Sequence, residues 1–118
     1  GRAPPKAGCT WNAIRALSKK LTDASKDVYG TGFPISGSED TVWRLWPMIW
    51  QQGGEVLDKA NKKALFAGPQ GVKALQLLTD MARKDKSLYA DQTPDTEKMY
   101  GLFDSGKMAM IVTGSWQL

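Results

Sequence analysis

Two segments carry apolar residues at intervals of three and four positions, the spacing of one helix face. The first runs from Thr10, a residue type suited to cap a helix N-terminus, to about Thr22. The second spans residues 67–85, with Pro69 placed for a first turn. Their apolar stripes are Trp11, Ile14, Leu17 and Leu21 in the first, and Val72, Leu75, Leu78 and Met81 in the second. These patterns predict two amphipathic helices whose stripes face a core.

A third helix is predicted over residues 41–52. Its apolar face consists of Trp43, Trp46 and Trp50. Pro47 removes one helical hydrogen bond, so we expect either a kink or a start shortly before it. The pair Gly53-Gly54 should end the helix. Burying an indole removes about 150–250 Å² from water, which favours core positions for Trp46 and Trp50.

Short extended segments separate the helices. YGTGF at residues 29–33 predicts a strand, and the continuously apolar MAMIV at residues 108–112 predicts a strand covered on both faces. Residues 55–66 predict a small hairpin around the polar turn DKANK. Residues 87–92, SLYADQ, form a polar connection. It leads to a helix that is capped by Thr93, continues with Pro94, carries Met99, Leu102 and Phe103, and stops at Gly106.

Helices that alternate with short strands indicate an α/β fold class. We expect one partial α/β lobe over residues 10–118. Residues 1–9 form a linker or a trimmed start, because GRAPPKAG is proline-rich and not periodic. Cys9 is expected to be a free thiol. The chain ends in TGSWQL, turn residues that suggest a helix beginning, and we therefore expect the chain to be a piece of a longer protein.

Composition narrows the possible chemistry. The 118 residues include no histidine and one cysteine, so the chain alone cannot assemble a serine–histidine or cysteine–histidine catalytic pair or a thiolate zinc site. We expect no metal and no cofactor. Net charge is +4, but the 16 basic residues are dispersed, so nucleic acid is not an expected partner. No apolar run approaches the roughly 20 residues that cross a bilayer.

Five stretches occur in an order that is typical of one known family: TWNAIRALSKKLT, YGTGF, WPMIWQQGGEVLD, FAGPQGVKALQLLTDM and LFDSGKMAMIVTGSW. Over residues 4–118 the chain resembles the family 1 extracellular solute-binding proteins of ABC sugar importers, the maltose-binding-protein-like group. The chain departs from the family at Asn12-Ala13, where relatives carry an acidic capping pair after the tryptophan, and at Ser115, where relatives often have proline.

The resemblance implies a helix-rich, partial lobe of the periplasmic-binding-protein-like (type II) fold, from the middle of a C-terminal lobe. It implies a non-enzymatic bacterial protein that binds a sugar or oligosaccharide between two lobes and delivers it to the membrane subunits of an ABC transporter. The expected location is extracytoplasmic, either periplasmic or anchored on the cell surface as a lipoprotein. The expected partners are the sugar, the other lobe and the transporter.

By the same resemblance, two tryptophans of this lobe face the ligand, Trp43 and Trp116. Thr41, Arg44, Gly114 and Ser115 are the neighbouring candidates. A pyranose ring has an apolar C–H face and a rim of hydroxyl groups, so its site needs a flat aromatic surface and a few fixed polar groups. Contact of Arg44 with the ligand would favour an acidic or phosphorylated sugar.

Two other functions remain open from the sequence. A glycoside-acting enzyme needs two carboxylates across a bond, for which the pairs Glu39 and Asp40 or Asp95 and Glu97 are the candidates. Adjacent carboxylates in polar loops are more simply helix caps. Alternatively, the chain is a non-catalytic assembly unit that associates with a copy of itself through uncovered strand edges and apolar surface.

Overall fold

The computed structural model describes residues 8–117, and its centre is a parallel sheet of three strands. These are β1 (Tyr29–Pro34), β2 (Leu88–Asp91) and β3 (Met108–Met110), in the order β2-β1-β3. Thr31 in the middle strand pairs with Leu88 on one side and with Met110 on the other. Because all the strands are parallel, their carboxyl ends lie at one edge of the sheet, the edge where open α/β sheets present ligands.

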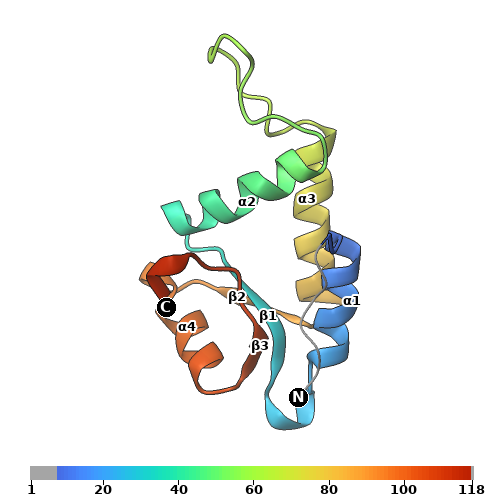
Figure 1. Cartoon of the computed structure of the whole chain (residues 1–118), viewed down its shortest axis with the longest axis vertical. Coiled ribbons are helices and arrows are strands. Elements are labelled where there is room, and N and C mark those ends of the chain that lie inside the picture. Colours follow the sequence, from blue (N-terminus) through green and yellow to red (C-terminus); the bar gives the residue numbers. More distant parts are fainter. Residues whose placement is uncertain (1–7, 118) are drawn as a thin grey trace.

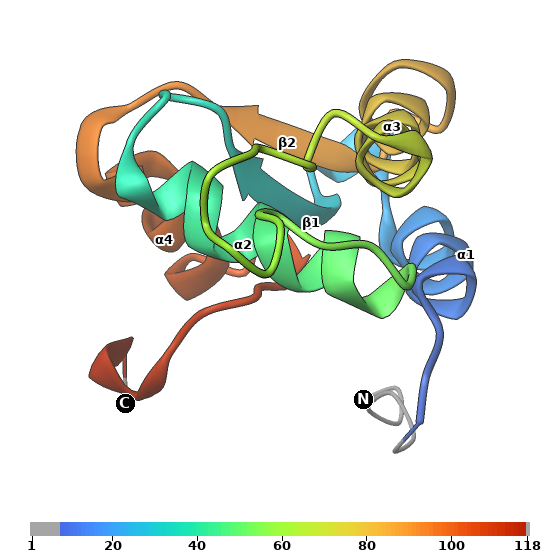
Figure 2. The same cartoon turned by 90° about the horizontal axis from the view of Figure 1, so that it is seen from above.

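Helices cover both sides of the sheet and this edge. Figure 1 shows α1 (Trp11–Leu21) and α3 (Pro69–Thr79) on one side and α4 (Glu97–Asp104) on the other. The remaining helix, α2 (Glu39–Gln51), lies across the carboxyl edge (Figures 1 and 2). Shorter turns complete the chain: the 3₁₀ turns Ala24–Lys26, Pro94–Thr96 and Ser115–Gln117, and a π-helical turn, Asp80–Lys84, that extends α3.

The core lies between the sheet, α2 and α3. Its buried members are Phe33, Met48, Ile49, Ala74, Leu77, Met81 and Leu88. Trp11 is partly buried and packs against them, as predicted, while its indole N–H donates to the Gln51 side chain. Within residues 8–117, no helix is long and apolar enough to cross a membrane.

Local signals located most helix ends correctly. Thr10 caps α1, with its hydroxyl oxygen accepting from the Ala13 N–H at 3.2 Å, so the cap forms without the family's acidic pair. Pro69 stands in the first turn of α3, and Gly53, at φ +80°, follows the end of α2. The hairpin is confirmed in outline by an antiparallel bridge between Leu57 and Ala64.

The predicted buried face of α2 is wrong. Trp46 and Trp50 are 38% and 47% exposed, whereas Met48 and Ile49 are almost fully buried. The helix also begins earlier than predicted, at Glu39, and passes through Pro47 as one continuous helix, which excludes a late start. Two sets of apolar side chains compete for burial on this helix. Met48 and Ile49, rather than the indoles, pack in the core with Phe33.

The predicted stripe of α3 is also partly wrong. Val72 and Leu75 are exposed, and the buried positions near the start of the helix are Gly71 and Ala74. Ala74 packs in the core with Met48 and Ile49 of α2, and Gly71 lies against the backbone of Phe66, where no side chain would fit. Packing of α3 against α2 and against the loop before it therefore decided which face turned inward.

Two strands differ from their predictions. The polar connection at residues 87–92 contains β2, and MAMIV forms only the short edge strand β3, in which Ala109 is exposed rather than covered. The predicted helix after Thr93 is a 3₁₀ turn followed by α4. Of the predicted linker, residues 1–7 lie outside the described part of the chain, as does Leu118.

Candidate functional site

Two tryptophans from opposite ends of the chain meet beside the carboxyl edge of the sheet. Trp43 lies in the second turn of α2, and Trp116 lies in the 3₁₀ turn that follows β3. Their ring centroids are 5.4 Å apart and their planes make an angle of 84°, an edge-to-face contact. Trp43 is partly buried and Trp116 is 65% exposed. The structure thus brings together the two residues that the sequence singled out.

Asp40 and Arg44 both contact the indole of Trp43, one at its N–H and the other over its ring face. Its Nε1–H donates to Asp40 Oδ1 at 2.8 Å, and the Arg44 guanidinium carbon lies 4.0 Å from the ring centroid, a cation–π contact. Burial raises the pKa of Asp40, but hydrogen bonds from Trp43 and Arg44, together with the charge of Arg44, outweigh it and hold this pKa below its usual value. Asp40 is therefore ionised at neutral pH.

Arg44 itself is buried and joins three segments of the chain. Its Nε–H donates to the carbonyl of Val112 at 2.9 Å, and one terminal nitrogen donates to Tyr100 Oη at 2.8 Å. The other terminal nitrogen donates to both the carbonyl and the carboxylate of Asp40. The guanidinium thus ties α2 to α4 and to the segment that carries Trp116. These four hydrogen bonds direct most of its donors to the protein.

Two residues that the sequence did not identify complete this network. Tyr100 Oη lies 3.3 Å from Thr113 Oγ1, and Thr96 Oγ1 donates to Asp95 O at 2.7 Å and to Asp40 Oδ2 at 3.3 Å. Burial raises the pKa of Tyr100, while side-chain hydrogen bonds, the first of them with Thr113, lower it, and the net direction is down. Thr96 is fully buried at φ +55°, a left-handed conformation that is unusual for a β-branched residue.

The sequence indicates the contacts of Asp40 with Trp43 and Arg44, but not those made by Tyr100 and Thr96. Asp40, Trp43 and Arg44 stand at i, i+3 and i+4, the spacing at which helix side chains touch. Nothing in the local sequence marks Tyr100 as a neighbour of Arg44 or Thr96 as a neighbour of Asp40.

The remaining predicted residues divide between two places. Gly114 lies under the Trp116 ring, because a Cβ built on it would be 2.0 Å from a ring carbon, and Ser115 is exposed beside it. Thr41 lies elsewhere, in a groove between α2 and α3 that it shares with Leu45. Its Oγ1 is buried and has no hydrogen-bond partner among residues 8–117. Thr41 is thus separated from the tryptophan pair.

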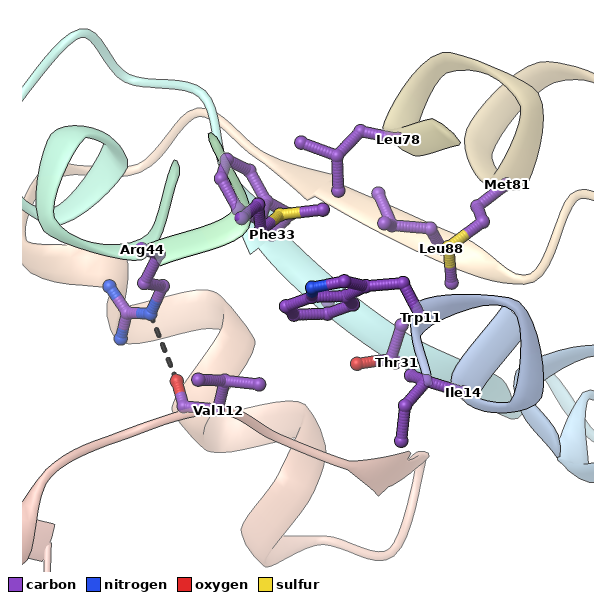
Figure 3. A pocket seen from close by; sticks show the side chains of 11 residues that line it. Trp11, Ile14, Thr31, Phe33, Arg44, Leu78, Met81, Leu88 and Val112 are labelled. Carbon is purple, nitrogen blue, oxygen red and sulfur yellow. Dashed lines mark hydrogen bonds between the residues drawn. The ribbon is translucent and has the colours of Figure 1, made fainter. Parts of the chain in front are cut away.

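Figure 3 shows a pocket in the interior beside this network, lined by Trp11, Phe33 and Met81 on one side and by Arg44 and Val112 on the other. The open space inside is about 40 Å³. This is room for little more than water, whereas small-molecule sites typically enclose about 300–1,000 Å³. The surface at Trp43 and Trp116 is therefore the candidate site, and the interior pocket is not.

The carboxylate pairs considered for catalysis are placed differently from an acid/base pair in a cleft. Asp40 accepts hydrogen bonds from Trp43, Arg44 and Thr96 and is held by them. Glu39 is exposed in the first turn of α2, and Asp95 and Glu97 are exposed around the start of α4. In residues 8–117, no three His, Cys, Asp or Glu side chains are grouped so that they could hold a metal ion.

Solved structures with the same fold are known in bacteria. An ABC substrate-binding protein from Listeria monocytogenes in complex with cycloalternan is 28% identical, with a TM-score of 0.80, and the match covers 98% of this chain and 29% of that chain. An ABC transporter solute-binding protein from Thermotoga lettingae TMO bound with α-D-tagatose is 30% identical, with a TM-score of 0.81, covering 97% of this chain and 28% of that one.

A third similar structure is the cyclic α-maltosyl-1,6-maltose binding protein from Arthrobacter globiformis, at 27% identity and a TM-score of 0.76, covering 98% of this chain and 27% of that one. The chain therefore spans less than a third of the length of these proteins. A search of curated proteins finds no match.

These likenesses confirm the helix-rich α/β fold of a periplasmic-binding-protein-like lobe, present here in part. None of them supports a glycoside-acting enzyme. The family model of the bacterial extracellular solute-binding proteins matches residues 3–118, almost the whole sequence. The chain belongs to the bacterial extracellular solute-binding protein family.

Proposed function

We propose that this chain is the carbohydrate-binding part of an extracytoplasmic solute-binding protein that delivers a sugar or oligosaccharide to an ABC transporter. The observation that carries the proposal is the contact of Trp43 with Trp116 at the carboxyl edge of the sheet. The names of the similar structures, which include an α-D-tagatose complex and two proteins of cyclic oligosaccharides, support a saccharide as the ligand class.

The geometry suits a sugar ring. An edge-to-face pair keeps the face of one indole open, and Trp116 is the more exposed of the two. A pyranose lays its C–H face on such a surface, while its hydroxyl groups need donors and acceptors at the rim. Ser115 is exposed next to the ring, and Thr113, whose hydroxyl lies 3.3 Å from Tyr100 Oη, is three residues before Trp116 in the chain. Binding is noncovalent and involves no reaction.

The partners follow from this proposal. A second lobe would close over the sugar from the opposite side, and the membrane subunits of the transporter would receive it. The location is the extracytoplasmic space, either as a free periplasmic protein or anchored on the cell surface. Because one lobe supplies only part of the contacts, this chain by itself should bind sugar weakly.

The test is a titration of the full chain with mono- and oligosaccharides, followed by tryptophan emission. Sugar should shift or quench the emission, and Trp116→Ala should weaken binding about tenfold, equivalent to ~1.4 kcal/mol. Phe103→Ala is the matched control, since Phe103 is an exposed aromatic residue on α4. Affinity that is equal in Trp116→Ala and in the unmodified chain would remove Trp116 from the site.

A further inference from the structure

The outward face of α2 is a row of aromatic side chains. At about 100° per residue, positions 43, 46 and 50 fall within an arc of about 60°. Trp46 and Trp50 have ring centroids 6.3 Å apart, with planes tilted by 60°, and both are exposed. The inward face of the same helix is already occupied by the core residues Met48 and Ile49. Because the core side of α2 is already filled, the exposed indoles are not core residues that failed to be buried.

The hairpin of residues 55–66 forms a second wall beside Trp46 and Trp50. Figure 1 shows this segment projecting from the C-terminal end of α2, on the side away from the sheet. Between them lies an open groove of about 670 Å³, and both indoles and the hairpin residue Leu65 line it. This volume lies within the range of about 300–1,000 Å³ that is usual for small-molecule sites.

Polar side chains also line this groove, and we call them its rim. They are Glu55, Asp58, Lys59 and Asn61. Asp58 Oδ1 accepts from the N–H groups of Lys62 and Lys63, which shapes the turn. Within residues 8–117, the side chains of Glu55, Lys59 and Asn61 form no hydrogen bond or ion pair, so their donors and acceptors are available at the rim.

This combination fits a saccharide better than an apolar partner. Indole faces suit the C–H faces of sugar rings, and the carboxylate, ammonium and amide groups suit hydroxyls, which both donate and accept. A lipid or an apolar protein surface would instead leave three polar side chains of the rim without partners, at a cost in free energy.

We propose that this groove is a second saccharide subsite, and that the ligand is an oligosaccharide lying along α2 from the Trp43–Trp116 pair to the groove. The proposal rests on the proposed function. Along a helix that rises 1.5 Å per residue, Trp43 and Trp50 are about 10.5 Å apart, further than a single sugar ring reaches. Affinity should therefore increase with the number of sugar units.

The experiment compares Trp50→Ala with Trp116→Ala in the full chain. The probes are D-glucose and α-1,4- and α-1,6-linked glucosyl oligosaccharides of two to six units, each titrated by calorimetry. Trp50→Ala should weaken binding of the longest bound probe about tenfold and leave that of the shortest unchanged. Trp116→Ala should weaken all of them. Phe66→Ala is the matched control, because Phe66 is an exposed aromatic residue at the end of the same hairpin.

Each other outcome separates the two proposals. Unchanged affinity of Trp50→Ala for every length, with Trp116→Ala weakened, overturns the second subsite and keeps the proposed function. An equal loss at all lengths, or a dimer of the unmodified chain that Trp50→Ala converts to monomer in sedimentation, also overturns the subsite. Absence of any saccharide binding overturns both. Asn61→Ala, an exposed rim variant, provides the same length comparison if Trp50→Ala does not fold.

Discussion

Replacement of Arg44 by methionine tests how the candidate site is built. The Arg44 side chain is only 2% exposed, and its guanidinium bonds to α2, α4 and the segment after β3 together. Methionine fills the aliphatic part of the space but donates no hydrogen bond. Arg44→Met therefore leaves the carboxylate of Asp40, the hydroxyl of Tyr100 and the carbonyl of Val112 without this donor.

The size of the effect follows from these contacts. Removing one partner of a buried ion pair costs about 3–5 kcal/mol, because the other charge stays behind. The Asp40 side chain is 23% exposed, so water replaces part of the lost interaction, and we expect the lower end of the range, about 3 kcal/mol. At about 4 °C per kcal/mol for a domain of this size, the unfolding midpoint should fall by about 12 °C.

Urea unfolding followed by tryptophan fluorescence measures this loss. Val72→Ala is the control, because Val72 is exposed on α3 and should cost less than about 1 kcal/mol. In the double variant Arg44→Met/Asp40→Asn, the loss should be smaller than the sum of the two single losses, since the carboxylate no longer needs a cation. If Arg44→Met is as stable as Val72→Ala, the guanidinium does not hold these segments together and the reasoning is refuted.

Three further outcomes are expected. Gly71→Ala should destabilise the chain by about 1–3 kcal/mol in urea unfolding, because its Cβ would lie 1.7 Å from the carbonyl oxygen of Phe66; a smaller change would mean that the loop moves freely. Gly114→Ala should displace the exposed Trp116 ring and weaken sugar binding in a fluorescence titration with little change in unfolding; equal affinity would contradict the placement of the ring. A hydrogen bond from the Arg15 guanidinium lowers the pKa of Asp85. The stability that this carboxylate contributes is therefore present above about pH 4 and is lost as the pH falls below that value. In Asp85→Asn, the unfolding midpoint should therefore fall less between about pH 5 and pH 3 than in the unmodified chain. An equal fall in both would contradict this.

Local sequence signals were sufficient where one segment determines its own structure. Thr10 caps α1, Pro69 begins α3 and Gly53 follows α2, because capping and backbone preferences act within a few residues. The strand β2 was missed because Asp91, fully buried, makes its segment read as polar. Its carboxylate accepts from the N–H groups of Thr93 and Met99, partners that only the folded chain provides.

The orientation of α2 could not be read from its pattern. Hydrophobic periodicity identifies a helix with an apolar face, but here Met48 and Ile49 compete with Trp43, Trp46 and Trp50 for the buried positions. Both sets of side chains would gain from burial, so the shape of the space above the sheet decided between them.

The sequence by itself determined the family, the α/β class, most helix ends and the two tryptophans of the candidate site. The tertiary structure alone decided that Trp43 meets Trp116, that Arg44 is held by groups from three segments, and that Thr41 lies apart. The physical reason is distance along the chain. Capping and periodicity act between neighbours in sequence, whereas edge-to-face contact, ion pairing and close packing join side chains that are tens of residues apart and form only when the sheet and helices assemble.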